Sequence, residues 1–208
     1  MTMEKNTLLK KAALKKKQKK ESLLNTAFEL FLTKGLAKTT ISDIAEKAGV
    51  AKGTFYLYFK DKYDICDSLV SSKAGAIFLN AHRSLANTDI HEFEDQILYI
   101  LDHVLNQLNE DKALLRFIEK NLSWGIFRKA LDSTLPDEDC NIYELYEEML
   151  KKSSKSYKTP ELMLFTLVEL ISSTGYSCIL YNEPVSMEEY KPILYRTVRS
   201  IMNSFCEG

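Results

Sequence analysis

Hydrogen-bond donors gather in one short stretch of the chain, residues 52–62, at a spacing that suits contact with a nucleic acid. Ammonium and hydroxyl groups are common partners of DNA phosphates, and lysine also donates to guanine edges in the major groove. The donors in this stretch are Lys52, Thr54, Tyr56, Tyr58, Lys60 and Lys62. Gly53 stands among them and would let the backbone approach a duplex closely. The stretch therefore predicts DNA binding.

Two short helical patterns on either side of Gly49 would position these donors. Apolar residues of the first pattern follow the helical i, i+3, i+4, i+7 spacing, at Ile41, Ile44, Ala45 and Ala48. Thr40 and Asp43 have the spacing of a capping box, and Gly49 suits the left-handed residue that ends a helix. A second helix would follow, with Phe55 and Phe59 holding it on the core. Two helices joined in this way form a helix-turn-helix, whose second helix enters the major groove.

Residues 17–78 resemble the N-terminal domain of the tetracycline-repressor (TetR) family of transcription regulators. The matching positions run from a first helix through the second helix of the helix-turn-helix. They are Ala27, Phe28, Leu30, Phe31, Gly35, Thr39, Thr40, Ile44, Ala45, Ala48, Gly49, Val50, Lys52, Gly53, Thr54, Tyr56, Tyr58, Phe59 and Lys62. Ala51 stands where the family usually has serine, so the second helix lacks a hydroxyl cap worth about 1 kcal/mol. Leu36 replaces a more usual aromatic residue, which should alter only local packing.

The resemblance implies an all-α fold, with an N-terminal three-helix helix-turn-helix domain and a larger helical domain for ligand binding and dimerisation. The donor pattern and the resemblance together predict which residues touch DNA. Phosphates would be held by Thr39, Thr40, Tyr56, Tyr58, Lys60 and Lys62. Base edges would be faced by Lys52, Gly53 and Thr54. The partner would be double-stranded DNA, a palindromic operator read by a homodimer whose recognition helices lie about 34 Å apart.

Charge is distributed unevenly along the chain. Residues 1–60 contain 13 lysines and five acidic residues, a net charge of +8, so the remainder carries −9 within the total of −1. A basic N-terminal third is the expected footprint of phosphate binding. We expect a Lys-rich extension at residues 1–16, a helix-turn-helix domain at 17–78 and a regulatory and dimerisation domain at 79–208.

Lysines crowd the extension and the start of the first helix, at Lys10, Lys11, Lys15, Lys16, Lys17, Lys19 and Lys20. Three interpretations stay open. The segment is a solvated, partly frayed tail, or it is an arm that adds phosphate contacts and makes DNA affinity more salt-dependent. A basic amphipathic helix at a membrane surface is the third interpretation, and the least favoured one beside a helix-turn-helix.

Successive helices are expected over the rest of the chain, at about 61–86, 91–109, 111–131, 141–153, 160–182 and 186–205. Loops are expected at residues 135–137 and 182–184, where proline and polar residues cluster. The chain has no run of 18 apolar residues and no apparent secretory signal, which predicts a cytoplasmic protein without a membrane span. Cys66, Cys140, Cys178 and Cys206 are scattered, so reduced thiols are expected.

The last two predicted helices occupy the place of the family's dimer interface, a four-helix bundle with two helices from each subunit. Their apolar and small residues suit that role. The predicted interface residues are Leu164, Leu167, Val168, Ile171, Gly175, Leu194, Val198 and Ile201. The alternative is that this apolar surface is the core of a single chain.

Family members commonly bind a small molecule between the middle helices, and the helix at 61–86 would relay that binding to the DNA-reading domain. Candidate pocket residues are His82, Tyr99, His103, Phe117, Trp124, Phe127 and Tyr176. Together they allow an aromatic-lined site with a few polar groups, for a small apolar or aromatic effector. Core packing is the alternative for each of them.

The expected function is a homodimeric, sequence-specific transcription regulator, namely a repressor released by a small-molecule ligand. Two alternatives stay open: a regulator without small-molecule sensing, which answers a protein partner or acts constitutively, and an activator. The sequence contains no nucleophile elbow, phosphate-binding loop or dinucleotide-binding turn. Its histidines and cysteines form no zinc pattern, so we expect neither an enzyme nor a cofactor or metal site.

Overall fold

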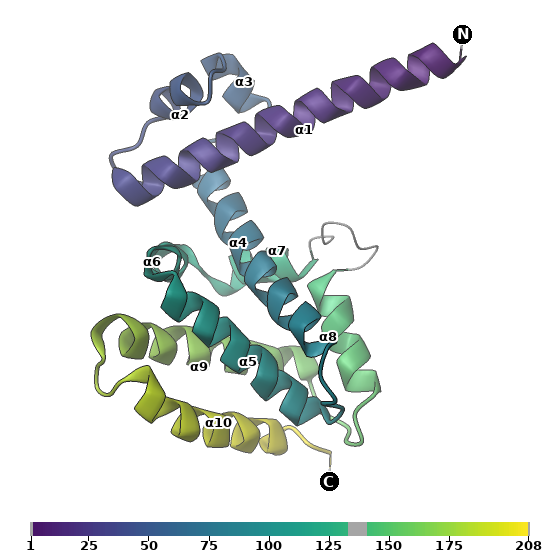
Figure 1. Ribbon diagram of the computed structural model, residues 1–208, viewed down its shortest axis with the longest axis vertical. Coiled ribbons are helices and arrows are strands. Elements are labelled where there is room, and N and C mark those ends of the chain that lie inside the picture. The colour runs from purple at the N-terminus through teal and green to yellow at the C-terminus, as the bar shows by residue number, and fades with distance from the viewer. Residues whose placement is uncertain (1, 133–140, 208) are drawn as a thin grey trace. The chain divides into compact units, whose positions relative to one another are not determined.

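The computed structural model describes residues 2–132 and 141–207, and Figure 1 shows how their helices are arranged. The elements within these ranges are all helices, and an isolated bridge pairs Tyr157 with Cys206. The all-α prediction is therefore confirmed. The chain divides into two compact units, residues 1–69 (the N-terminal unit) and residues 70–208 (the C-terminal unit).

The N-terminal unit contains α1 (Thr2–Thr33), α2 (Ile41–Lys47), α3 (Lys52–Tyr56) and the first turns of α4 (Lys62–Leu85). On α1, apolar residues recur four positions apart, so Leu23, Ala27 and Phe31 share one face and are buried. α2 packs on α1 and buries Ile44 and Ala45. α3 packs on this small core through contacts with α2.

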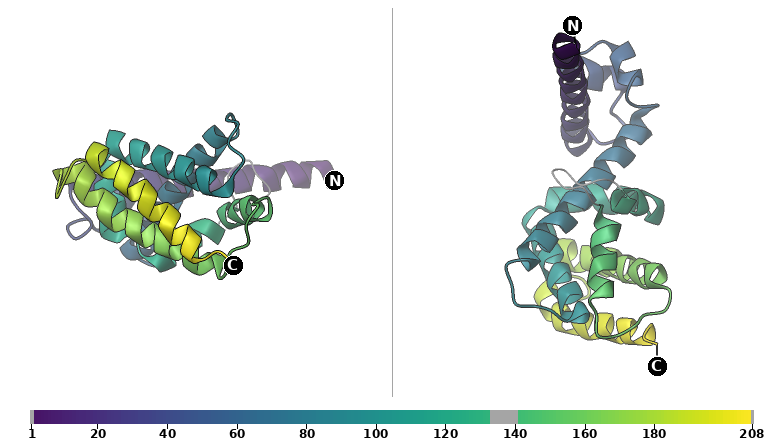
Figure 2. Two further views of the ribbon diagram at one scale, coloured as in Figure 1. Left: turned by 90° about the horizontal axis from the view of Figure 1, so that it is seen from below. Right: turned by 90° about the vertical axis from the view of Figure 1, so that its right-hand side faces the viewer.

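The first helix continues without a break through the residues predicted to form a Lys-rich extension. Its N-terminal part projects beyond α2 and α3, as Figures 1 and 2 show. The described side chains of Lys11 and residues 13–21 are exposed, whereas burial begins at Ser22 and Leu23. The extension is therefore helical, and these side chains lie outside the core.

The C-terminal unit contains the rest of α4 and the helices that follow it. They are α5 (Phe93–Glu110), α6 (Lys112–Asn121), α7 (Trp124–Asp132), α8 (Ile142–Lys151), α9 (Pro160–Tyr181) and α10 (Met187–Ser204). Capping boxes start α8, with Asn141 and Glu144, and α10, with Ser186 and Glu189. Pro160 opens α9, at a position where its missing N–H leaves no helical bond unmade.

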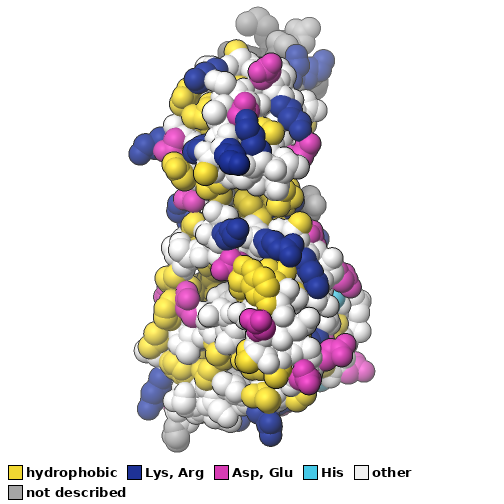
Figure 3. Space-filling view, turned by 90° about the vertical axis from the view of Figure 1, so that its left-hand side faces the viewer, with side chains coloured by type: hydrophobic (Ala, Val, Ile, Leu, Met, Phe, Trp, Pro, Cys, Tyr) yellow, Lys and Arg dark blue, Asp and Glu magenta, His cyan; other side chains and the backbone are white. Residues whose placement is uncertain are grey.

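The core of the C-terminal unit joins helices from the whole length of that unit. α9 and α10 lie side by side (Figures 1 and 2), and Met163 and Leu194 are fully buried. Tyr146 of α8 is also buried, and its hydroxyl donates to the Pro160 carbonyl at 2.9 Å. Burial raises the pKa of Tyr146. Figure 3 shows that other apolar side chains stay exposed among the charged ones.

Residues 111–131 form two helices rather than the single helix that apolar periodicity predicts. α6 ends at Asn121 because Leu122 takes an extended conformation, with ψ of 125°. The Ser123 hydroxyl then accepts a hydrogen bond from the Ile126 amide at 3.4 Å, at the start of α7. Ser123 is therefore the local cap signal, although the apolar periodicity of the sequence continues across it.

The remaining predicted helices are confirmed to within two residues at each end. The predicted loop at residues 182–184 is also confirmed, and Asn182 there has a left-handed conformation with φ of 54°. The predicted loop at 135–137 and Cys140 lie outside the described residues.

Candidate nucleic-acid interface

A capping box fixes the start of α2. The Thr40 hydroxyl accepts a hydrogen bond from the Asp43 amide at 3.1 Å, and the Asp43 carboxylate accepts one from the Thr40 amide at 2.8 Å. Lys34, just after α1, places its Nζ 2.6 Å from the same carboxylate. The hydrogen bonds from Lys34 and Thr40 lower the pKa of Asp43 from 3.8 to about 2. The predicted cap is confirmed, and Thr40 remains exposed.

The turn between α2 and α3 depends on Gly49. Its φ of +68° is the left-handed conformation that side chains other than glycine adopt at a cost. The Val50 amide donates to the Ala45 carbonyl at 2.9 Å, which closes the end of α2. Val50 is half-buried, so it covers the core only in part. The predicted helix end at Gly49 is confirmed.

Phe55 attaches α3 to the core of the N-terminal unit. Its side chain is fully buried, and its ring lies 5.7 Å from the Phe59 ring and edge-on to Tyr56 at 5.6 Å. α3 ends at Tyr56, so Phe59 belongs to the following turn rather than to the helix. Phe59 is still only 3% exposed, so both predicted anchors lie in the core. Ala51, the residue before α3, makes no side-chain cap, as expected because its methyl group cannot accept a hydrogen bond.

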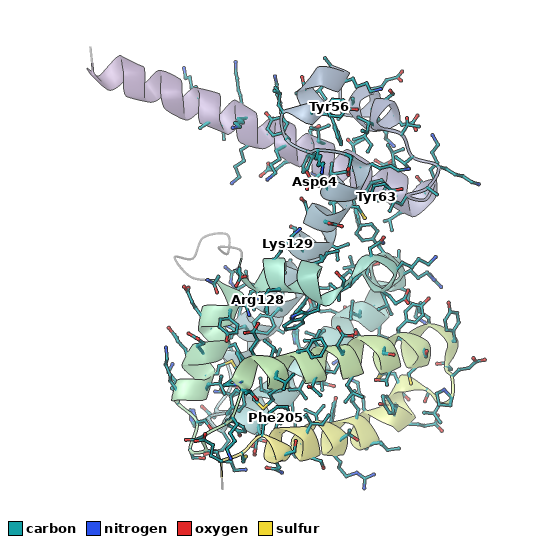
Figure 4. The ribbon with its side chains drawn as sticks, turned by 180° about the vertical axis from the view of Figure 1, so that it is seen from behind. Tyr56, Tyr63, Asp64, Arg128, Lys129 and Phe205 are labelled. Atoms are coloured by element: carbon teal, nitrogen blue, oxygen red, sulfur yellow. The ribbon has the colours of Figure 1, made fainter. Side chains whose placement is uncertain are left out.

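The outer side of α3 and of the turn after it presents polar groups to solvent. Lys52, Gly53, Tyr56 and Lys60 are exposed, and Figure 4 marks Tyr56 on this helix. A Cβ at Gly53 would meet no atom within 4 Å, and its φ is not one that requires glycine. Packing within the chain therefore does not explain a glycine that costs a helix interior about 1 kcal/mol. Close approach of a duplex, the role predicted for Gly53, therefore stays a prediction.

Thr54 and Tyr58, the other two donors of this stretch, are half-buried. Tyr58 lies beside Phe59, with ring centroids 6.5 Å apart, so part of its ring belongs to the core. Both residues present only part of their side chains to the surface.

Thr39 and Lys62 occupy positions unlike those expected of phosphate ligands. Thr39 is fully buried, and its hydroxyl donates to the Gly35 carbonyl at 2.8 Å. The Lys62 ammonium donates to the carbonyls of Leu36, Ala37 and Thr39, at 2.9, 3.0 and 3.2 Å. An ammonium has three N–H donors, and these carbonyls use all of them. Both side chains therefore brace the loop between α1 and α2.

Three further side chains of the N-terminal unit are exposed and were not among the predicted DNA contacts. Leu57 is 76% exposed, Tyr63 is 60% exposed, and Lys38 is exposed in the loop before α2. Leu57 lies two residues from each buried phenylalanine, Phe55 and Phe59. That offset puts it about half a turn away from the core, which is the signal that could have found it.

The sequence that forms this interface matches a known family of regulators. Residues 23–69 match the family model described as bacterial regulatory proteins, tetR family. The chain belongs to the TetR family. A helix-turn-helix transcriptional regulator of Staphylococcus aureus (strain USA300) is 24% identical to this TetR-family chain over 179 residues. That alignment covers 86% of this chain and 91% of the relative.

Solved structures share the TetR-family fold. A TetR transcriptional regulator from Rhodococcus sp. RHA1 superposes with a TM-score of 0.61 at 19% identity, over 90% of this chain and 97% of that one. SmeT, the repressor of the Stenotrophomonas maltophilia multidrug efflux pump SmeDEF, gives a TM-score of 0.58 at 17% identity, over 90% of each chain. These structures support the fold, and the family makes the chain a TetR-family helix-turn-helix transcriptional regulator.

Most of the residues predicted for a TetR-family dimer interface lie in the core of the C-terminal unit. Five of the eight are buried within this single chain, namely Leu164, Leu167, Gly175, Leu194 and Val198. A residue buried within its own chain is not available to a second chain, so these five belong to the core of their own unit. The other three, Val168, Ile171 and Ile201, are half-exposed and pack against the same core.

The seven predicted pocket residues lie on several helices of the C-terminal unit. Tyr99 and His103 stack with ring centroids 6.2 Å apart, and the Tyr99 hydroxyl shares a hydrogen bond with Ser84 at 2.8 Å. A hollow of about 630 Å³, open to solvent, is lined by Tyr99 with Asp95 and Arg199, among others. None of the other six predicted residues lines this hollow.

Those other six residues are engaged by neighbouring side chains. Trp124 lies edge-on to Phe165 at 4.9 Å and 5.8 Å from Phe127. His82 lies over Phe78 on α4, Phe117 is buried in α6, and Tyr176 shares a hydrogen bond with Tyr181. Across the described ranges, no three His, Cys, Asp or Glu side chains gather as a metal site would require.

Proposed function

We propose that this TetR-family regulator is a cytoplasmic homodimeric repressor that binds a palindromic DNA sequence and is released from it by a small molecule. The observation that carries the DNA-reading part is the exposed side of α3, with Lys52, Gly53 and Tyr56 outside and Phe55 anchored beneath them. In this proposal the base edges meet Lys52, Gly53 and Thr54. Phosphates are held by Thr40, Tyr56, Tyr58 and Lys60.

Lys52→Ala is expected to change base preference, because a bidentate contact to a base edge is worth about 1–3 kcal/mol of discrimination. Tyr56→Phe is the matched control, since it removes one phosphate donor and should weaken binding to all sequences alike. The measurement is affinity for a duplex selected from a random pool by the intact protein, against random competitor DNA. Equal binding of the intact protein to every duplex would contradict sequence-specific recognition.

A second copy of the chain is the partner proposed for the outer side of α9 and α10. By length and composition alone α9 is apolar enough to cross a membrane. Only 33% of this apolar stretch is buried within the unit, so most of it is left for another partner to cover. Leu162 of α9 is 52% exposed and Ile193 of α10 is 49% exposed. Exposed apolar side chains on two adjacent helices suit a homodimer interface, whose core is more apolar than other surfaces. A palindromic operator requires the same two-fold symmetry.

The double variant Leu162→Glu, Ile193→Glu is expected to be monomeric, because the interface would bury carboxylates that have no partner there. Light scattering after size-exclusion chromatography measures the mass, and circular dichroism checks that the helices remain. Leu57→Glu is the control, because Leu57 is equally apolar and more exposed but lies in the N-terminal unit. A double variant that stayed dimeric would place the interface elsewhere.

Release by a small apolar or aromatic effector is proposed at the hollow lined by Tyr99. Its volume of about 630 Å³ is comparable to that of small-molecule sites. Such an effector acts by binding the DNA-incompetent state more tightly than the competent one. A regulator without small-molecule sensing is the alternative, and the mutual packing of Trp124, Phe127 and Phe165 favours it, because that packing fills space between helices.

A thermal-shift screen of apolar and aromatic compounds separates these two candidates. A compound that raises the melting temperature, releases DNA and loses its effect in Tyr99→Ala supports sensing at the hollow. A screen without such a compound favours the alternative. Transcription from a promoter that carries the selected duplex then distinguishes a repressor from an activator.

A further inference from the structure

The N-terminal part of α1 is a helix with no core beneath its described side chains. Among the described side chains of α1, Leu23 is the first that is fully buried, and those of Lys11 and residues 13–21 are exposed. Residues 2–20 are here named the helical arm. Figure 1 shows this arm projecting from the N-terminal unit past α3. Burial therefore does not explain the described side chains of the arm.

The arm is crowded with positive charge. Its described side chains include six lysines and no acidic residue, namely Lys11, Lys15, Lys16, Lys17, Lys19 and Lys20. Lysines stand four residues apart at 11 and 15, at 15 and 19, and at 16 and 20, and like charges at this spacing destabilise a helix. Among the described side chains, the one ion pair that offsets them joins Lys17 to Glu21 at 4.0 Å. A polyanion alongside would relieve this repulsion.

The base of the arm is attached to the same turn and helix that present the candidate DNA-binding residues. The Ser22 hydroxyl donates to the Ala48 carbonyl at 3.3 Å, next to the turn at Gly49. The Lys20 ammonium lies 5.9 Å from the centre of the Phe59 ring, just after α3. The arm therefore leaves the unit beside α3, and its charge continues the surface that α3 presents.

We propose that the helical arm lies along the phosphate backbone of the DNA, beside the bases that α3 reads, and supplies affinity without supplying sequence preference. This inference rests on the proposed function, because it needs DNA bound at α3. From Lys11 to Lys20 the arm spans about 14 Å at 1.5 Å per residue. A duplex carries about eight phosphate charges over that length.

The arrangement of the lysines favours DNA over a membrane surface. Successive helix residues lie about 100° apart, so the consecutive Lys15, Lys16 and Lys17 spread around the arm. Leu14 is 56% exposed, and it shares its side of the helix with Lys11 and Lys17, three residues away on either side. A helix that lies in a membrane surface needs a continuous apolar face. A phosphate backbone requires only positive charge.

The test compares two fourfold lysine-to-glutamine variants with the intact protein. The arm variant changes Lys11, Lys15, Lys16 and Lys19, which make no ion pair or hydrogen bond with the described side chains. The control variant changes Lys112, Lys120, Lys152 and Lys158, which are exposed lysines of the C-terminal unit. Both variants lose four positive charges. A difference in DNA affinity between them therefore reflects where in the chain the lysines lie.

Affinity is measured from 50 to 200 mM KCl, on a random duplex and on a duplex that the intact protein selects from a random pool. A helix turns about half its circumference to a surface, so about two of the four arm lysines should reach phosphates. The slope of log affinity against log salt should fall by about 1.8 per bound chain. Raising KCl from 50 to 200 mM weakens binding of both proteins. The factor by which the arm variant weakens should be roughly 12 times smaller than the factor for the intact protein. Its preference for the selected duplex should stay unchanged, as should both quantities in the control variant.

The outcomes separate the arm from the proposed function. If the intact protein does not prefer its selected duplex, the proposed function fails. If that preference holds but the arm variant keeps the salt slope of the intact protein, the arm proposal is overturned. Vesicles rich in phosphatidylserine test the membrane interpretation. Vesicle binding that is lost in the arm variant while its DNA slope is unchanged would also overturn the proposal.

Discussion

Replacing Phe55 by alanine is expected to cost the N-terminal unit about 3–5 kcal/mol of folding stability and to abolish DNA binding. Phe55 is fully buried and contacts Phe59 and Tyr56, so its removal leaves a cavity beneath α3. A small domain has a total stability of only about 5–15 kcal/mol. The loss should therefore displace a helix of five residues that has no side-chain cap of its own.

Urea unfolding followed by circular dichroism measures this loss, and DNA titration measures its consequence. Tyr56→Ala is the matched control, because Tyr56 is the next residue on α3 and is 52% exposed. It should change stability by less than about 0.5 kcal/mol and still weaken DNA binding. Phe55→Leu should recover part of the stability, since it refills part of the cavity. An unchanged urea midpoint in Phe55→Ala would show that Phe55 does not anchor α3.

Lys62→Met is expected to lower the stability of the N-terminal unit by about 1–2 kcal/mol and to leave the salt dependence of DNA binding unchanged. The three carbonyls that share the Lys62 ammonium, those of Leu36, Ala37 and Thr39, would lose a charged donor. Hydrogen bonds to charged groups are worth about 1.5–3 kcal/mol, and partial exposure of this site reduces that value. Methionine keeps most of the apolar stem of lysine, so the change in stability measures the contribution of the ammonium group.

Lys60→Met provides the opposite result in the same assays. Lys60 is exposed two residues earlier, where its ammonium is proposed to meet a phosphate. Its replacement should leave the melting temperature unchanged and lower the salt slope by about 0.9 per bound chain. If Lys62→Met instead lowered the salt slope without changing the melting temperature, Lys62 would be a phosphate ligand rather than a brace for the loop.

The sequence alone predicted those parts of the N-terminal unit that depend on neighbours within one or two helical turns. The capping box of Thr40 and Asp43 and the helix end at Gly49 were confirmed because each involves residues at most five positions apart. The burial of Phe55 and Phe59 followed from their spacing and apolar character. The surface of α3 could be named in advance for the same reason.

Roles that depend on distant residues could not be predicted in this way. Lys62 looked like a phosphate ligand because it is a lysine near the recognition helix, but its carbonyl partners lie 23–26 residues earlier in the chain. Thr39 resembled its neighbour Thr40, and only the packed loop shows that one hydroxyl is buried while the other caps α2. Chemistry of the side chain alone does not distinguish a brace from a ligand.

The helical fold and the segment proposed to read DNA followed from the sequence, because helix periodicity, caps and turn residues act locally. Which apolar faces are core and which are surface depends instead on how the helices pack together. Leu164 and Leu194 belong to the same kind of apolar stripe as Leu162 and Ile193, yet the first pair is buried and the second is exposed. An apolar stripe predicts that another surface covers it. Only the packing of α9 on α10 shows which residues of the stripe are already covered within the chain.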